Sequence, residues 1–127
     1  MNKHARQVIT QLKKLDRPPH WIEINVNTSH GYDYGHGGEP STTVEYEIWA
    51  KNGTTISRPL SLIDGNQKES RQEGISTAKK IVEEVSRNYN PRGYEKRIFE
   101  DTNEFDTWPL TRRVYANRIV LNSKKKK

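Results

Sequence analysis

The segment around Asn52-Gly53 limits the possible folds more than any other part of the chain. On its N-terminal side apolar and polar residues alternate, which is typical of a strand with one buried face. The Asn-Gly pair is a strong hairpin signal, because both residues tolerate positive φ angles. The sequence therefore predicts an antiparallel hairpin with strands at residues 42–50 and 54–60. The inward-facing residues of its first strand are Val44, Tyr46 and Ile48.

A helix is predicted on each side of this hairpin. The clearer one covers residues 69–89, where apolar residues recur at three- and four-residue spacing and charged residues fill the opposite face. Its apolar residues are Ile75, Ala78, Ile81 or Val82, and Val85. A shorter helix is expected at residues 2–15. Its apolar stripe is narrower, and it ends before Pro18 and Pro19 because the residue preceding a proline is disfavoured in the α region.

Three further segments complete the expected secondary structure. Apolar and polar residues alternate over residues 22–26, which is typical of a half-buried strand. The segment 94–100 is also strand-like, and the segment 110–121 suits either a strand or a helix. This order indicates an α+β fold, in which one main helix packs on a small antiparallel sheet and a short N-terminal helix accompanies it. We expect a single α+β domain over residues 1–121 and a disordered basic tail over residues 122–127.

Positive charge is concentrated towards the C-terminal end. The net charge is +6, and residues 112–127 hold seven Lys or Arg and no acid, so the preceding residues are close to neutral in sum. A basic arm of this kind attracts polyanions, most commonly nucleic acid. The chain has no Cys, no apolar run long enough to span a membrane and no apolar segment typical of a secretory signal. We therefore expect a soluble, cytoplasmic protein without disulfides and without a membrane partner.

Aromatic rings interleaved with cations suggest a way to hold nucleic acid or a nucleotide, because bases stack on rings while cations contact phosphate. The candidate ligand-binding residues are Lys68, Arg71, Lys79, Lys80, Arg92, Arg97, Trp108, Arg112, Arg113 and Tyr115. Three other rings, those of Trp21, Trp49 and Phe99, are assigned to the core. Only 31% of the residues are hydrophobic, so large side chains are needed to build one.

The Gly-rich segment 27–41 offers two alternatives. Its backbone N–H groups are suited to an anion, but phosphate-binding loops normally lead into a helix, and this segment leads into a strand. A connector between two strands is the favoured interpretation. The side chains of His30, Asp33 and His36 are of a type that binds metal, yet no fourth ligand is evident. No metal and no other cofactor is predicted.

No catalytic motif stands out. The chain has neither a nucleophile elbow nor a cysteine nucleophile. Glu45 and Glu47 share one face of a predicted strand, where they either flank a site or simply solubilise the surface. An enzyme that uses a metal in the Gly-rich segment remains a third hypothesis, behind the two binding functions described below.

The order helix, three strands, helix resembles a double-stranded RNA-binding domain over about residues 5–88. In that family the basic start of the last helix grips phosphates, and the resemblance implies this role for Lys68 and Arg71, with Ala78 and Ile81 in the core. The sequence departs from the family pattern in two ways: Lys68 stands where paired lysines are usual, and Gly74 falls where a small helix former is expected.

Two binding functions follow from these observations. The first is a small non-enzymatic binding module for nucleic acid or a nucleotide, which uses the basic arm together with arginine and aromatic contacts. The alternative is a phage or mobile-element accessory or inhibitory protein that acts by binding a partner protein. A salt titration separates them, because phosphate binding weakens steeply with salt and an apolar protein interface does not.

Overall fold

A computed structural model describes residues 2–29, 40–108 and 110–124 of the chain. Within these residues the order of elements is α1 (Lys3–Lys13), β1 (Trp21–Ser29), β2 (Ser41–Trp49), β3 (Thr55–Asp64), α2 (Lys68–Asn88), β4 (Tyr94–Asp101), β5 (Phe105–Trp108) and β6 (Thr111–Ser123). The predicted α+β class is confirmed, and the sheet has six antiparallel strands.

The strand order in the sheet is β3-β2-β1-β6-β4, and β5 pairs with the first residues of β6. Two strands from opposite ends of the chain, β1 and β6, therefore lie side by side in the middle. The predicted hairpin β2–β3 forms around Asn52-Gly53. Only Gly53 of the pair has a positive φ, of +87°, so the turn does not use Asn52 in the expected way. The ambiguous segment 110–121 is a strand, and β6 continues through residues 122 and 123, which we expected to begin the tail. Of the rest of that expected tail, Lys124 is described and residues 125–127 lie outside the described residues.

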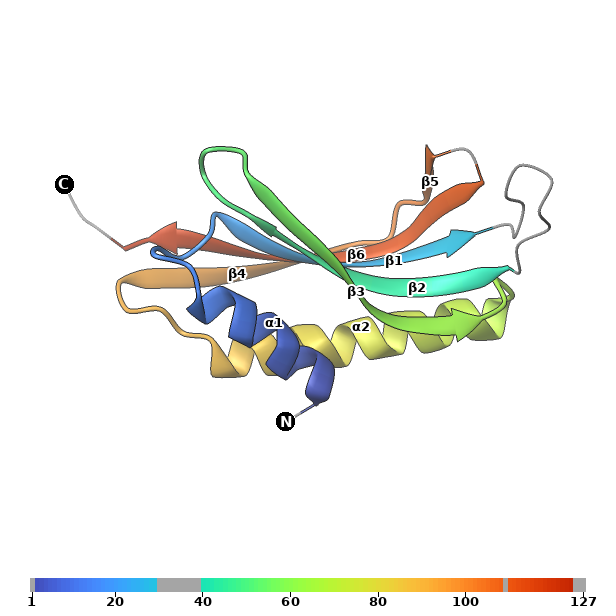
Figure 1. Ribbon diagram of the computed structural model, residues 1–127, viewed down its shortest axis with the longest axis horizontal. Coiled ribbons are helices and arrows are strands. Elements are labelled where there is room, and N and C mark those ends of the chain that lie inside the picture. The colour runs from blue at the N-terminus through green and yellow to red at the C-terminus, as the bar shows by residue number, and fades with distance from the viewer. Residues whose placement is uncertain (1, 30–39, 109, 125–127) are drawn as a thin grey trace.

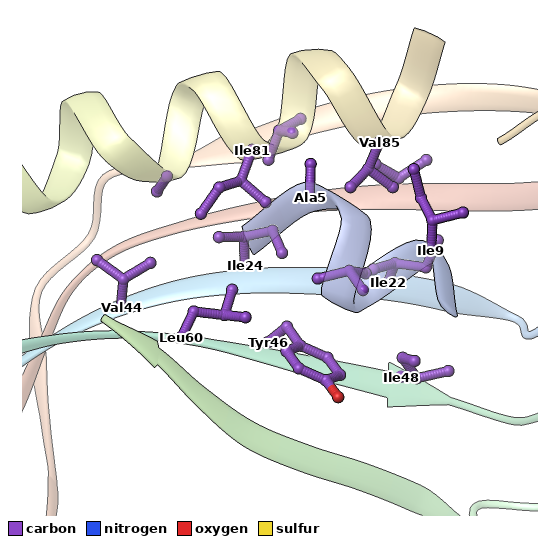
Figure 2. Packing of buried hydrophobic residues seen from close by; sticks show 14 of the residues in the cluster. Ala5, Ile9, Ile22, Ile24, Val44, Tyr46, Ile48, Leu60, Ile81 and Val85 are labelled. Carbon is purple, nitrogen blue, oxygen red and sulfur yellow. The ribbon is translucent and has the colours of Figure 1, made fainter. Parts of the chain in front are cut away.

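Both helices lie on one face of the sheet (Figure 1), where α2 packs against β1, β2 and β6 while α1 packs against α2. Figure 2 shows Ile81 and Val85 of α2 and Ala5 of α1 above Ile22 and Ile24 of β1. All five side chains have an exposed fraction of 0%. We call this side of the sheet the covered face and the opposite side the open face.

The position of each helix has a local reason. The Asn2 side chain caps α1 by accepting a hydrogen bond from the backbone N–H of His4 at 2.7 Å. Helix α2 lies close to the sheet at Gly74. A Cβ atom at this position would lie 2.9 Å from methyl carbons of both Val26 and Thr42, so only glycine allows this packing distance.

The open face is concave. In Figure 1 the β2–β3 turn and β5 both bend away from the helices, so the sheet curls around this side. Glu23 and Asn25 point to the open face and are nevertheless buried, with exposed fractions of 7% and 3%. Of the Gly-rich segment 27–41, residues 27–29 belong to β1, and residues 30–39 lie outside the described residues.

Candidate functional site

The four cations predicted on α2 do not form one surface. Arg71 lies at the first turns of the helix and pairs with Glu104 at 3.5 Å. The Nζ of Lys79, two turns further along, is 4.0 Å from a Glu100 carboxylate oxygen. Lys68 and Lys80 are exposed and form no ion pair with any residue that the structure describes. Half of this set is therefore neutralised locally.

Arg112 and Arg113 point to opposite faces of the sheet, because successive residues of β6 alternate. On the open face, Arg113 pairs with Asp101 at 2.6 Å and its guanidinium lies 4.3 Å from the centre of the Phe105 ring. Towards the covered side, Arg112 pairs with Asp106 at 3.1 Å. The two arginines that begin the predicted basic arm are thus already occupied by acids, and the ring beside Arg113 is that of Phe105.

Tyr115 is buried, with an exposed fraction of 1%, and we expected its ring to be available for stacking. Its hydroxyl donates a hydrogen bond to Glu100 at 2.9 Å and accepts one from the Asn117 amide at 3.0 Å. Burial and the bond to Glu100 raise the pKa of Tyr115 to about 12. The tyrosine is part of the core beneath α2, and a base cannot reach its ring face. Trp108 belongs to β5 by its backbone, and its side chain lies outside the described part of the structure.

Arg92 and Arg97, the last two predicted residues, are both exposed near the start of β4. Arg97 is 3.8 Å from Glu95, two residues earlier in the chain. Arg92 lies in the turn after α2 and forms no ion pair with a described residue. The neighbouring Gly93 accepts a hydrogen bond from the backbone N–H of Lys124 at 2.7 Å, which places the chain after β6 beside this turn.

Unpaired cations gather at one end of the sheet, where β2 and β6 finish and β1 and β4 begin. This end also receives the C-terminus of α1 (Figure 1). We call it the basic end, and its cations are Lys13, Lys14, Arg17, Lys51, Arg92 and Lys124. All six are exposed, and none forms an ion pair with a residue that the structure describes. Their charges are available to a ligand.

Half of these cations come from the end of helix α1 and the connection that follows it, namely Lys13, Lys14 and Arg17, and the predicted binding residues include none of them. The outward side of α1 carries Lys3, Arg6 and Lys13, all exposed, opposite the stripe that enters the core. Residues 1–22 hold five Lys or Arg and a single acid, Asp16. Because residues 1–111 are almost neutral in sum, counting charge over long segments conceals this excess. A count over individual elements would have revealed it.

The open face carries a continuous polar and aromatic row. Trp21 and Trp49 stack with ring centres 5.1 Å apart, and the Arg118 guanidinium covers Trp21 at 4.6 Å. Arg118 also donates two hydrogen bonds to one oxygen of Glu23, at 2.7 and 3.0 Å. Phe99, opposite Arg118 in the register of β4 and β6, has an exposed fraction of 53%. The assignment of these three rings to the core is wrong, because all of them line the face without helices.

Two carboxylates on the same face form no ion pair with a described residue. Glu45 accepts a hydrogen bond from the Asn27 amide at 2.7 Å, and Glu47 accepts bonds from Asn25 and from the Trp49 indole. Burial raises the pKa of both glutamates, and the negative charge of a neighbouring glutamate raises each further. The open face is therefore unsuited to phosphate, whereas the basic end is suited to it.

Other kinds of site receive no support from the described residues. Among them there is no group of three or more His, Cys, Asp and Glu arranged to hold a metal ion, and the predicted candidates His30, Asp33 and His36 lie outside that part of the chain. None of the described helices is long and apolar enough to cross a membrane. Comparisons of the chain with family models, curated proteins and solved structures find no match.

Proposed function

We propose that this protein binds nucleic acid through its basic end, chiefly by contacts to phosphate. The observation that supports the proposal is the contrast in pairing between two groups of cations. Six exposed cations gather at the basic end without an acidic partner among the described residues, whereas Arg71, Lys79 and Arg113 elsewhere are each held by an acid. Lys68 and Lys80 also form no ion pair with a described residue, but they lie twelve residues apart on α2. Unpaired cations on one surface attract a polyanion most strongly, because no internal ion pair has to be broken first.

This proposal keeps the predicted ligand class and moves its main site. Of the ten candidate residues, Arg92 belongs to the basic end, while Lys68 and Lys80 are cations on α2 without an ion pair to a described residue. The lysines at residues 125–127 follow Lys124 in the sequence and add three more positive charges. Arg112 and Arg113 become secondary contacts, since a phosphate would have to displace the acids that hold them.

The test is a fluorescence anisotropy titration with a labelled oligonucleotide at several salt concentrations. Replacing Lys13, Lys14 and Arg17 together by Gln is expected to weaken binding at low salt and to reduce the salt slope by about one unit for each phosphate interaction that the variant removes. A matched control replaces Arg71, Arg87 and Arg97 by Gln, which removes the same charge from ion-paired positions. Its effect is expected to be smaller.

Equal effects of the two triple variants would show that binding follows net charge and not the basic end. Absence of binding by the wild-type protein at low salt would contradict the proposal altogether. The partner-protein alternative would then take its place. The exposed side chains of Phe99 and Phe105 would then offer apolar surface to such a partner.

A further inference from the structure

A cleft opens at the basic end between the connection that follows α1 and the β2–β3 turn. Its volume is ≈ 430 Å³. This size falls within the range of small-ligand sites, roughly 300–1,000 Å³. The lining residues are Leu15, Asp16, Arg17, Pro18, Pro19, Ala50, Lys51 and Asn52.

The walls of the cleft combine apolar surface with free charge. Pro18 and Ala50 present partly exposed aliphatic surface, against which a flat base can lie, whereas Pro19 is buried. Arg17 and Lys51 come from the two opposite sides, and neither forms an ion pair with a described residue. Such a combination of a flat apolar wall and flanking cations matches a nucleotide, whose base is apolar on its faces and whose phosphate is anionic.

Backbone hydrogen bonds fix both sides of the cleft. The N–H of His20 donates to the Trp49 carbonyl at 2.7 Å, which ties the end of the connection to the end of β2. In the turn, the N–H of Ala50 donates to the Thr54 carbonyl at 2.9 Å, and the Ala50 carbonyl accepts from Gly53 at 3.0 Å. The two consecutive prolines restrict the other wall. A site shaped in advance costs a ligand less ordering entropy.

We propose that this cleft receives the base of an unpaired nucleotide, so that the protein prefers single-stranded nucleic acid to duplex. The inference rests on the proposed function, because the surrounding basic end supplies the phosphate contacts. In a duplex the bases are stacked and paired, and extruding one costs a few kcal/mol. Asp16 at the rim is able to accept hydrogen bonds from the amino group of a base, as acidic side chains do from cytosine.

The experiment compares a labelled single strand of about 12 nucleotides, a length within the usual site sizes, with its duplex at one low salt concentration. Wild-type protein is expected to bind the single strand about tenfold more tightly, because a duplex must first extrude a base at a cost of a few kcal/mol. Ala50→Leu fills the cleft without changing charge, and is expected to lower single-strand affinity to the duplex level while leaving duplex affinity unchanged. Ser76→Leu adds similar bulk on the exposed side of α2, and is expected to change neither affinity.

A second measurement does not depend on any variant. Titration of the wild-type protein with a dinucleotide is expected to shift the NMR amide signals of Arg17, Ala50 and Lys51 before those of α2. Equal affinity for single strand and duplex, with no shifts at the cleft, would overturn the inference and leave the proposed function standing. Failure to bind either oligonucleotide would overturn the proposed function and the inference together.

Discussion

The two faces of the sheet are built from the same strands and are stabilised in different ways. On the covered face, side chains such as Ile22, Ile24 and Val44 are removed from water by α2, and their contribution is mainly hydrophobic. On the open face, Glu23 and Asn25 on the same strand are buried by their neighbours, without a second layer. Their burial depends on hydrogen bonds and on Arg118.

The difference shows that burial alone does not define a core. An aliphatic side chain keeps most of its stabilising effect when one neighbour is removed, because the others remain. A buried carboxylate does not, because it depends on a few specific donors. On the covered face, the loss of stability caused by a mutation should therefore follow the side-chain volume that it removes. On the open face, the loss should depend on which hydrogen-bonding partner is removed.

The largest expected effect concerns the covered face. Ile81 in the middle of α2 has an exposed fraction of 0%, and Ile81→Ala is expected to lower the free energy of unfolding by about 2–5 kcal/mol. Urea unfolding followed by circular dichroism measures it. A decrease comparable to that of an exposed substitution such as Ser76→Ala would show that α2 packs only loosely on the sheet.

The counterpart on the open face is Arg118→Ala, which leaves the Glu23 carboxylate buried without its two donated bonds. We expect a decrease of about 1–3 kcal/mol by the same measurement. The control is Arg87→Ala, which removes an exposed pair with Glu83 of a kind that contributes about 0.3–0.5 kcal/mol. If the two variants are destabilised equally, the open face is an ordinary surface and the comparison of the faces fails.

Gly74→Ala probes the packing of α2 on the sheet, and it sets two effects against each other. Alanine improves helix propensity by up to about 1 kcal/mol, while overpacking typically costs about 1–3 kcal/mol. Because the new Cβ would lie 2.9 Å from side chains of Val26 and Thr42, we expect a net destabilisation, of about 1 kcal/mol from the difference of these two effects. A rise in the thermal midpoint would mean that the helix moves away from the sheet easily.

The smallest expected effect is a pH dependence on the open face. Burial raises the folded-state pKa of Glu45 and Glu47 above the ordinary value of 4.5. Between this ordinary pKa and the raised pKa of the folded state, the folded state binds more protons than the unfolded state. Stability contributed by these groups therefore falls as pH rises through that interval, and it stays reduced at neutral pH. The double variant Glu45→Gln/Glu47→Gln should not show this decline.

The measurement is urea unfolding of the wild type and of the double variant at several pH values, from the ordinary glutamate pKa of 4.5 up to neutral pH. It gives the free energy of unfolding of each protein as a function of pH. The paired acid Asp101 acts in the opposite direction, because hydrogen bonds from the Asn103 backbone and from Arg113 lower its pKa. Asp101→Asn should therefore reduce stability at neutral pH and not at low pH. A parallel pH profile of the Glu45/Glu47 variant and the wild type would contradict the account of the open face.

Most of the helices and strands could be predicted from the sequence, because their signals are local. The turn at Asn52-Gly53 and the periodicity of α2 are examples. The last strand was ambiguous for a physical reason. Its covered side includes the polar side chains of Tyr115 and Asn117, which share one hydrogen bond, and a bulge opposite β1 shifts the alternation. A hydrophobic pattern does not reveal such a side as buried.

The candidate site was predicted less well, because pairing between distant residues is not visible in a single sequence. Arg118 and Glu23 are 95 residues apart in the chain and adjacent in the sheet. The assignment of Trp21, Trp49 and Phe99 to the core was wrong for a related reason. The size of an aromatic ring does not indicate which face of the sheet the side chain occupies. The basic character of α1 was available in the sequence and needed only an element-by-element count.

The central position of β6 has a consequence for synthesis on the ribosome. This strand joins β1 to β4, yet it is translated after every other described element. Until residue 123 has emerged, β1 presents an unpaired edge and β4 has no partner strand. Pairings of such long sequence separation form slowly and late. The hairpins of β1, β2 and β3 can pair earlier, but the two halves of the sheet can be joined only after β6 has been synthesised.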